Sequence, residues 1–359
     1  MTPDGFTFYG GVSHGVEKRS KVRSRIVADQ LVKLIKEADH VVIMGHRMSD
    51  LDAIGSAEGV LSICKICDVP AVIAVRRDAT LAGSLIDALC KAGQRDDFID
   101  PKDALPIISK RTLCIVVDTY QAGLVESKEI LEKCGRVAVI DHHRKGVGYI
   151  QNPDLVCHEP YSSSASELVT ELLQYVGERD DKPNRVEAEG LLSGIMLDTR
   201  DFTLHTGVRT FEAAAALRRY GAETERVRQL FDVTMVEYNA KAGLVEKAKM
   251  YRNCAISIGG EVAAEARVAI AQAANDLLTI QGVDASFVAV QVGTGVNVSA
   301  RSLGAVNVQV IMESLGGGGH QTMAAAQLKH ITPEAARSRI EGAIDKYYAS
   351  QKKGGAEGK

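Results

Sequence analysis

The stretch Val41-Val42-Ile43-Met44-Gly45-His46-Arg47-Met48-Ser49-Asp50-Leu51-Asp52 decides the fold class of this chain. Its first four residues are apolar and predict a short buried strand, and Ala53–Cys67 after it has the pattern of a helix. The loop between them carries His46, Asp50 and Asp52. Carboxylates that lie together repel one another unless a cation binds them. The stretch therefore predicts a strand, a ligand-bearing loop and a helix, in that order.

The same arrangement recurs further along the chain. Asp118 ends the apolar run Leu113–Val117, and Asp141-His142-His143 follows the apolar run Val137–Ile140. Asp198 comes after a third apolar run, Leu191–Leu197, which ends a helix predicted over Val186–Leu197. Strands that alternate with helices at this spacing predict an α/β fold with a parallel sheet and helices on both faces. Ligands of such folds bind outside the carboxyl ends of the strands, which is where these polar residues fall.

Six side chains are candidates for metal binding: His46, Asp50, Asp52, Asp118, His142 and Asp198. A single Asp at the end of a strand is usually a cap or turn residue, but six such residues together favour a metal site. Nitrogen and oxygen ligands without a thiolate suit Mn²⁺, Mg²⁺, Fe²⁺ or Co²⁺ better than structural zinc. Asp118 and Asp198 each have two oxygens, so either can bridge two ions. Two ions about 3.5–4 Å apart activate a water for attack on a phosphoryl group.

Length and composition restrict the class of protein. A chain of 359 residues suits two domains, and a net charge of −3 gives no general attraction to long nucleic acid. Seven scattered cysteines indicate a reducing compartment without disulfides. No apolar run reaches the roughly 18–20 residues that span a bilayer, so we expect this part of the protein to be cytoplasmic.

Two further segments are candidates for substrate binding. Gly316–Gly319 precedes His320, and a backbone of glycines can approach an anion closely, with Arg301 as a phosphate partner. A flexible turn and an exposed arginine on an edge strand are the alternatives. Ser164, in the serine-rich stretch 162–166, is either a helix N-cap or a residue near the substrate, and the sequence does not separate these roles.

The histidine and aspartate motifs resemble those of the DHH phosphoesterase superfamily, over nearly the whole chain. The resemblance implies that one metal is held by His46, Asp50, Asp118 and Asp198, and the other by Asp52, Asp118, His142 and Asp198. It also implies that His143 faces the scissile phosphate and that Asp141 orients His143. Two divalent metal ions, with Mn²⁺ expected, would be the cofactors.

The glycine run resembles the nucleotide-binding DHH-associated domain of this superfamily. The resemblance implies that Gly317, Gly318, Gly319, His320 and Arg301 bind a nucleotide phosphodiester, and it places the active site in a cleft between the two domains. Family II pyrophosphatases have a different second domain, which argues against pyrophosphate as the substrate.

These expectations give the following domain boundaries. We expect a lead-in over residues 1–25, a DHH catalytic domain over 26–234, a connector helix over 235–250, a smaller α/β DHH-associated domain over 251–348 and a disordered tail over 349–359. The strands predicted for the second domain are Cys254–Ile258, Val268–Ile270, Ala285–Val292 and Val296–Arg301.

The lead-in resembles the junction between a GGDEF domain and the DHH domain in GdpP-type cyclic-di-AMP phosphodiesterases. Phe8-Tyr9-Gly10-Gly11 and the basic stretch 17–25 carry this resemblance. It implies a fragment of a membrane-anchored protein with upstream transmembrane, PAS and GGDEF segments, and a homodimer. The implied reaction is hydrolysis of cyclic di-AMP to 5′-pApA, with cyclic di-GMP left open. The alternatives are a nanoRNase or pAp phosphatase that acts on short linear oligonucleotides, and a sensing module that binds a cyclic dinucleotide without turnover.

Overall fold

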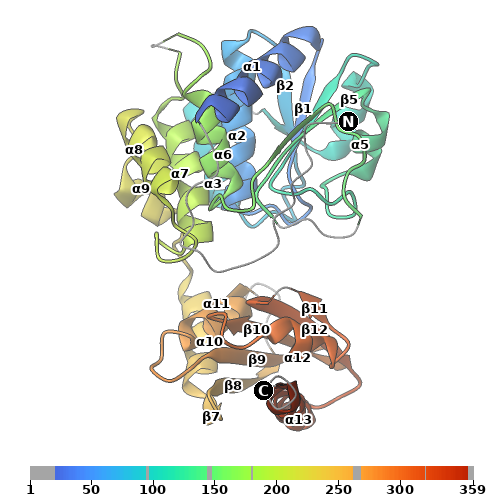
Figure 1. Ribbon diagram of the computed structural model, residues 1–359, viewed down its shortest axis with the longest axis vertical. Coiled ribbons are helices and arrows are strands. Elements are labelled where there is room, and N and C mark those ends of the chain that lie inside the picture. Colours follow the sequence, from blue (N-terminus) through green and yellow to red (C-terminus); the bar gives the residue numbers. More distant parts are fainter. Residues whose placement is uncertain are drawn as a thin grey trace. The chain divides into compact units, whose positions relative to one another are not determined.

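The computed structural model describes residues 21–93, 97–143, 148–178, 181–261, 268–319 and 321–354. The chain divides into two compact units, Met1–Phe231 and Asp232–Lys359. Figure 1 shows the helices and strands of each unit. Within the described residues, no helix has the length and apolar composition needed to cross a bilayer.

The first unit is built on a six-stranded parallel sheet. Its strands are β1 (Val41–Met44), β2 (Ala71–Ala74), β3 (Phe98–Ile99), β4 (Leu113–Val117), β5 (Arg136–Asp141) and β6 (Leu155–His158). Their order is β3-β2-β1-β4-β5-β6, so the chain builds outward from β1 in one direction and from β4 in the other. The crevice outside the carboxyl ends of β1 and β4 is the topological switch point at which such sheets bind ligands.

Helices lie on both faces of this sheet, which explains why its strands are continuous apolar runs. One face packs against α1 (Lys21–Glu37), α2 (Leu51–Ile66), α3 (Gly83–Gly93), α6 (Ala165–Leu173), α7 (Arg185–Thr199), α8 (Val208–Arg219) and α9 (Thr224–Gln229). The other packs against α4 (Pro101–Ala104), the 3-10 turn Leu105–Ile107 and α5 (Lys128–Lys133). Alternate residues of β1 divide between the two cores, since Ile43 belongs to the first and Val42 to the second. The predicted parallel α/β domain is confirmed.

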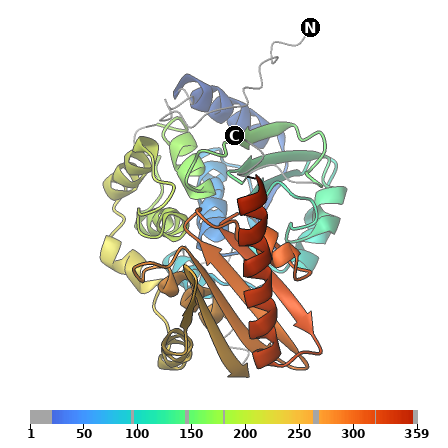
Figure 2. The ribbon, with the colours of Figure 1, turned by 60° about the horizontal axis from the view of Figure 1, so that its bottom comes forward.

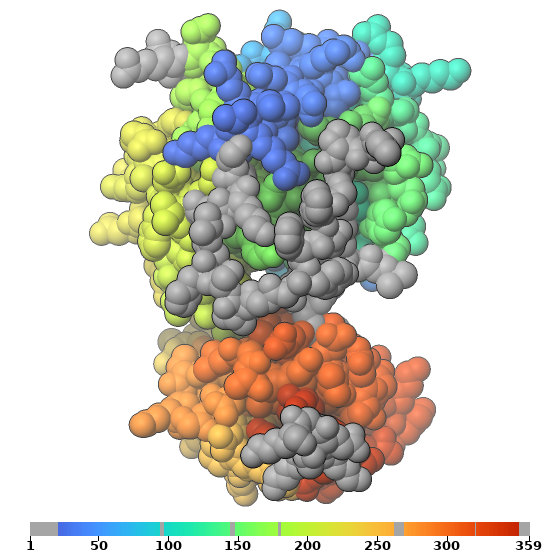
Figure 3. Space-filling model, in the orientation of Figure 1, coloured from blue at the N-terminus to red at the C-terminus, as the bar shows by residue number. Residues whose placement is uncertain are grey.

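Two glycines set the contact between α2 and α7. A Cβ added to Gly55 of α2 would lie 2.3 Å from the carbonyl oxygen of Gly190 in α7. The two helix backbones therefore touch, which any larger side chain at this position would prevent. This contact brings the first turn of α2 close to the last turns of α7. Figure 3 shows α1, in dark blue, on the surface of the same unit, where Val22 and Ile26 are exposed.

The second unit has a six-stranded mixed sheet in the order β11-β12-β10-β9-β8-β7. The strands are β7 (Lys249–Tyr251), β8 (Cys254–Glu261), β9 (Ala285–Val292), β10 (Gly295–Ser302), β11 (Gly318–Gly319) and β12 (Met323–Lys329), and only β8 and β9 run parallel. One face packs against α12 (Val308–Glu313) and α13 (Pro333–Gly354), and the other against α10 (Met235–Glu246) and α11 (Val268–Leu277). Figure 2 shows α13, in dark red, lying along the sheet.

Some elements of the second unit differ from the prediction. Val268–Ile270 is the first turn of α11 and not a strand. A short apolar run fits either structure, and here the alanine-rich residues that follow it continue the helix. The helix expected over 235–250 ends at Glu246, and β7 begins at Lys249. Helix α13 continues to Gly354, six residues past the expected boundary at 348.

Candidate metal centre

The candidate ligands lie at the carboxyl edge of the first sheet, around the switch point. His46 follows β1, Asp118 follows β4 and His142 follows β5. Asp50 and Asp52 are not in an irregular loop as predicted. Asp50 is the N-cap of α2 and accepts hydrogen bonds from two backbone N–H groups, and Asp52 lies in the first turn of α2.

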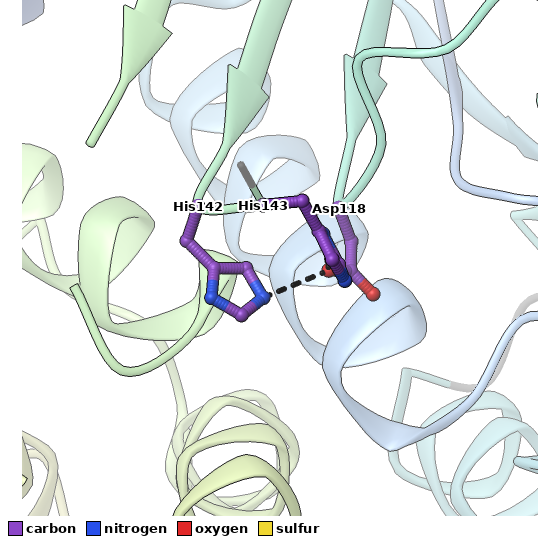
Figure 4. Close-up of side chains that lie close together, drawn as sticks. All are labelled: Asp118, His142 and His143. Carbon is purple, nitrogen blue, oxygen red and sulfur yellow. Dashed lines mark ion pairs between the residues drawn. The ribbon is translucent and has the colours of Figure 1, made fainter. Parts of the chain in front are cut away.

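Asp198 also comes from a helix, since it lies in the last turn of α7. The apolar run that precedes it belongs to this helix, as was predicted for Val186–Leu197. Helix α7 points its C-terminal end at the strand ends, so a helical residue reaches the same site. Figure 4 shows Asp118 and the His142-His143 pair extending from two neighbouring strands toward one another.

Asp118 joins two groups of ligand atoms through its two different oxygens. Its Oδ2 lies 3.3 Å from Nε2 of His46, which is 3.8 Å from Oδ1 of Asp50. Its Oδ1 lies 3.4 Å from Nε2 of His142. Two groups of ligand atoms that are each compact enough to hold one ion are His46-Asp50-Asp118 and Asp52-Asp118-His142-Asp198. A third such group is Asp118-His142-His143. Asp118 therefore belongs to all three groups.

The second group is the more buried of the two. Nε2 of His142 lies 3.1 Å from Oδ2 of Asp198 and 3.9 Å from Oδ2 of Asp52. Among the described residues Asp198 groups with this set alone. Asp198 was also expected to join His46, Asp50 and Asp118, but the structure does not place it in that group. Asp118 is the ligand that the two sets share.

The residues present fit bound metal ions. Oδ1 of Asp118 and Nε2 of His142 are buried and make no hydrogen bond of normal geometry, although they lie 3.4 Å apart. Buried polar atoms without a partner are rare and costly in folded proteins. Ligand atoms that converge on a point instead of pairing with one another are what a bound ion requires. The mixture of carboxylate oxygens and imidazole nitrogens suits Mn²⁺ and similar ions.

The pKa values of the cluster respond to its crowding. Burial opposes the charged form of His46, but hydrogen bonds and charge from Asp118 and Asp50 outweigh it and raise the pKa of His46 to about 10. Burial raises the pKa of Asp198 to about 6. The pKa of Asp118 is lowered, because its contacts with His142 and His46 outweigh the opposing effect of burial. In the absence of a cation, protons on the two histidines balance the carboxylates.

The backbone at Asp118 is unusual as well. Its φ is +56°, a left-handed conformation that aspartate tolerates better than most residues. Its N–H donates to the carbonyl of Ile140 at 3.0 Å. This turn directs the carboxylate across the ends of the strands instead of along β4. Backbone strain of this kind is concentrated at functional sites.

Asp52 is fixed by the N-terminus of α6. Its Oδ2 accepts a hydrogen bond from the N–H of Ala165 at 2.7 Å, and its Oδ1 accepts one from the N–H of Ser166 at 2.8 Å. Asp52 is fully buried, and burial together with the charges of Asp118 and Asp198 raises its pKa. Its Oδ2 also lies 3.9 Å from Nε2 of His142.

The serine-rich stretch builds this helix end. Ser164 is the N-cap of α6, and its buried hydroxyl oxygen accepts a hydrogen bond from the N–H of Glu167 at 3.0 Å. The buried carboxylate of Glu167 accepts hydrogen bonds from the hydroxyls of Ser162 (2.7 Å), Ser163 (2.6 Å) and Thr210 (2.7 Å). The cap role of Ser164 is thus present in the structure, and its substrate role stays a prediction. The sequence analysis did not identify Glu167 as a residue that organises the site.

Gly194 is a second residue that the sequence analysis missed. A Cβ at this position would lie 2.3 Å from Oγ of Ser166 and 2.6 Å from Oδ1 of Asp52. The signal in the sequence was the spacing of Gly190 and Gly194, one turn apart on a helix that precedes a candidate ligand.

His143 and Asp141 have the contact that was expected of them. Nδ1 of His143 lies 2.9 Å from Oδ1 of Asp141, which also accepts a hydrogen bond from the backbone N–H of His143 at 3.2 Å. The side chain of His143 is half exposed, and that of Asp141 is fully buried. Burial opposes the charged form of His143, but the contact with Asp141 and the charge of Asp118 outweigh it and raise its pKa. Among the described residues the ring is held through Nδ1, which leaves Nε2 for a ligand.

The glycine run of the second unit is partly a strand. Gly318 and Gly319 form β11 and pair with Ala325 and Ala324 of β12. A Cβ on Gly319 would lie 2.4 Å from the carbonyl oxygen of Met323, so this close approach explains why glycine is needed there. The alternative of a flexible turn therefore does not hold for these two residues.

The other candidates for substrate binding differ in how much space surrounds them. A Cβ on Gly317 would lie 2.2 Å from the carbonyl oxygen of Ala325, whereas one on Gly318 would meet open space. Arg301 on β10 pairs with Met323 of β12, so it lies at the same end of the sheet as Gly319. Its NH1 donates to Oγ of Ser299 at 3.1 Å and to the carbonyl oxygen of Ala300 at 2.9 Å. His320 lies outside the described residues.

Comparison with known families gives two matches. Residues 40–195 match the N-terminal domain of the DHH family, and residues 261–349 match the DHHA1 domain. Five of the six candidate metal ligands lie inside the first match, and Asp198 lies just beyond its end.

Comparison with known proteins identifies relatives over almost the whole chain. The chain is 46% identical over 352 residues to the cyclic-di-AMP phosphodiesterase GdpP of Geobacillus thermodenitrificans, with 96% of the chain and 53% of that protein covered. It is 42% identical over 350 residues to GdpP of Bacillus subtilis, with 95% and 53% covered. The chain thus spans about half the length of these relatives. An exopolyphosphatase-related protein from Bacteroides fragilis has the same fold, with a TM-score of 0.77 and 21% identity over 91% of this chain and 98% of that one.

Proposed function

This chain is a DHH family protein that also carries a DHHA1 domain, and we propose that it hydrolyses cyclic di-AMP to linear 5′-pApA with two divalent cations. Mn²⁺ is the expected ion. The observation that carries the proposal is the pair of contacts made by Asp118, whose two oxygens face His46 at 3.3 Å and His142 at 3.4 Å. The names of the relatives from Geobacillus and Bacillus supply the substrate class.

Each ligand set has a distinct part in this proposal. His46, Asp50 and Asp118 would hold one cation, and the set that contains His142 and Asp198 would hold the other. Two bound cations supply the Lewis acidity that activates a water and stabilises charge on the phosphoryl oxygens. The bonds from α6 to Asp52 keep its carboxylate oriented before any ion arrives.

His143 is the residue that we assign to the phosphate. Asp141 fixes its Nδ1, so the ring presents Nε2 to the half-open side of the site. A histidine held in this way can donate a hydrogen bond, or a proton, to an oxygen of the phosphodiester. Its raised pKa favours the protonated form that this role needs.

The second unit would bind the remaining part of the substrate. Arg301 lies on β10 and the open backbone at Gly318 on β11, two strands of one sheet that are separated by β12, and a guanidinium group suits a phosphate. Substrate binding by Gly317, Gly319 and His320, and a cleft between the two domains as the place of the reaction, remain predictions.

Product analysis tests the proposal. The purified chain is incubated with Mn²⁺ and with cyclic di-AMP, cyclic di-GMP, pApA or pAp in separate reactions, and the products are separated by chromatography. We expect cyclic di-AMP to be converted to pApA faster than any other substrate is consumed. Preferred turnover of pApA or pAp would instead identify a nanoRNase or pAp phosphatase. Tight binding of cyclic di-AMP without turnover, in protein shown to contain Mn²⁺, would identify a sensing module.

The context of the intact protein remains a prediction too. The relatives extend well beyond the segment that matches this chain. We propose that this segment works in the cytoplasm, as a homodimer, attached to upstream PAS, GGDEF and transmembrane segments. Mass measurement of the intact protein in detergent and in membrane fractions would test this organisation.

A further inference from the structure

The first unit contains a cavity that has no part in the metal centre. Its volume is about 480 Å³, and it is lined by α3, α7 and α9. Figure 1 shows these three helices in the same part of the first unit. Arg185, which lines the cavity, is the first residue of α7, whereas Asp198 lies at the other end of that helix. Thirteen residues of helix separate the two by about 20 Å.

The cavity wall combines apolar and cationic side chains. Leu85, Val186 and Leu230 contribute apolar surface, and Lys91, Arg185 and Arg226 contribute three positive charges. Glu189 is the single carboxylate in the lining. The excess of positive charge favours an anion, and the apolar surface favours a ligand that also has a flat apolar body.

Glu189 holds the two arginines in place. It is buried, and its Oε1 lies 3.3 Å from Nε of Arg226 and 3.8 Å from Nε of Arg185. Arg185 also lies 3.8 Å from Glu223 through NH1. Among the described residues, Arg226 contacts Glu189 through Nε, which leaves the terminal nitrogens of its guanidinium group for a ligand. A guanidinium group presents such nitrogens to a phosphate in a bidentate manner.

We propose that this cavity binds a nucleoside monophosphate, with the phosphate on Arg226 and Lys91 and the base against Leu85 and Leu230. The volume is within the range of about 300–1,000 Å³ that small-molecule sites have. The site is separate from the metal centre, so occupancy does not depend on bound cations. Since α7 runs from this cavity to Asp198, the ligand binds at one end of a helix that carries a metal ligand at the other.

Titration calorimetry with 5′-AMP tests this site. The full chain is titrated without divalent cations, and adenosine and inorganic phosphate are titrated separately. We expect 5′-AMP to bind at least about tenfold more tightly than adenosine or inorganic phosphate. Adenosine lacks the contacts with the cationic side chains, and inorganic phosphate lacks those with the apolar side chains. Equal binding of inorganic phosphate would reduce the site to a simple anion site and would overturn the proposal.

Variants locate the binding. Arg226→Glu should weaken 5′-AMP binding by more than about tenfold, since a charged hydrogen bond is replaced by repulsion. Arg228→Glu on the same helix is the matched control, because Arg228 does not line the cavity and pairs with Asp201 at 2.7 Å. Ala88→Trp fills the cavity without removing a charge and should also abolish binding, which keeps the test decisive if Arg226→Glu fails to fold.

The metal centre supplies the last comparison. Asp118→Ala should bind 5′-AMP as the unaltered chain does. Loss of binding in Asp118→Ala, together with full binding in Ala88→Trp, would place the nucleotide at the metal centre and contradict the proposal. Hydrolysis of cyclic di-AMP is measured separately, so its failure would leave this test unaffected.

Discussion

Gly194 of α7 lies against Asp52 of α2 so closely that a Cβ on the glycine would be 2.6 Å from Oδ1 of the carboxylate. This contact joins the helix that carries Asp198 to a ligand on a different helix. The backbone contact between Gly55 and Gly190 one turn away has the same effect. The geometry of the second ligand set therefore depends on glycines that bind nothing themselves.

Gly194→Ala should weaken Mn²⁺ binding at the set that contains Asp52. The added methyl group forces α7 away or rotates Asp52, at a cost of about 1–3 kcal/mol. Titration of Mn²⁺ followed by electron paramagnetic resonance measures the loss. Gly243→Ala in α10 is the control, since its Cβ would meet open space. Unchanged Mn²⁺ affinity in Gly194→Ala would show that the contact does not constrain Asp52.

Ser164→Ala should destabilise the protein by about 1 kcal/mol through loss of the cap of α6. Urea unfolding measures this change, and KM for cyclic di-AMP tests the alternative role at the substrate. Ser127→Ala, which removes the N-cap of α5, is the matched control. A rise in KM with Ser164→Ala, without loss of stability and without change in Mn²⁺ affinity, would establish a substrate contact instead of a cap.

The affinity for Mn²⁺ should rise with pH between 6 and 8. The pKa of His46 is raised to about 10 in the metal-free site, so the ring carries a proton throughout this range. A cation must displace that proton, and each displaced proton makes the apparent affinity rise about tenfold per pH unit. The pKa of Asp198 is about 6, so competition from a second proton sets in toward the acidic end. Calorimetry in buffers of different ionisation enthalpy measures the protons released. A Mn²⁺ affinity that does not change from pH 6 to pH 8 would contradict this account.

Arg301→Ala should raise KM for cyclic di-AMP by about tenfold or more, because a charged hydrogen bond to phosphate contributes about 1.5–3 kcal/mol. The Mn²⁺ affinity should not change, since Arg301 belongs to the second unit. Arg339→Ala on α13 is the control for loss of a positive charge from the same unit. Equal KM values for the two variants would remove Arg301 from the substrate site.

The parallel sheet and its candidate ligands could be predicted from the sequence. A strand that is buried on both faces is a continuous apolar run, and here such runs end at polar residues. Asp52 and Asp198 were identified as ligands, but the helices predicted over Ala53–Cys67 and Val186–Leu197 each stop one residue short of including them. A side chain at either end of a helix reaches the edge of the sheet as readily as one in a loop. Hydrogen bonds between distant segments, such as the one that Thr210 donates to Glu167, leave no local pattern in the sequence. The glycine run illustrates the same limit, since its pairing with β12 is a contact that the sequence does not display.

The most direct test is the rate at which the unaltered chain and Asp118→Ala convert cyclic di-AMP to 5′-pApA with saturating Mn²⁺. Asp118 contributes to both ligand sets, so its loss should remove turnover by at least about a thousandfold while the fold, followed by circular dichroism, persists. Retention of cyclic di-AMP hydrolysis by folded Asp118→Ala would contradict the shared-ligand mechanism.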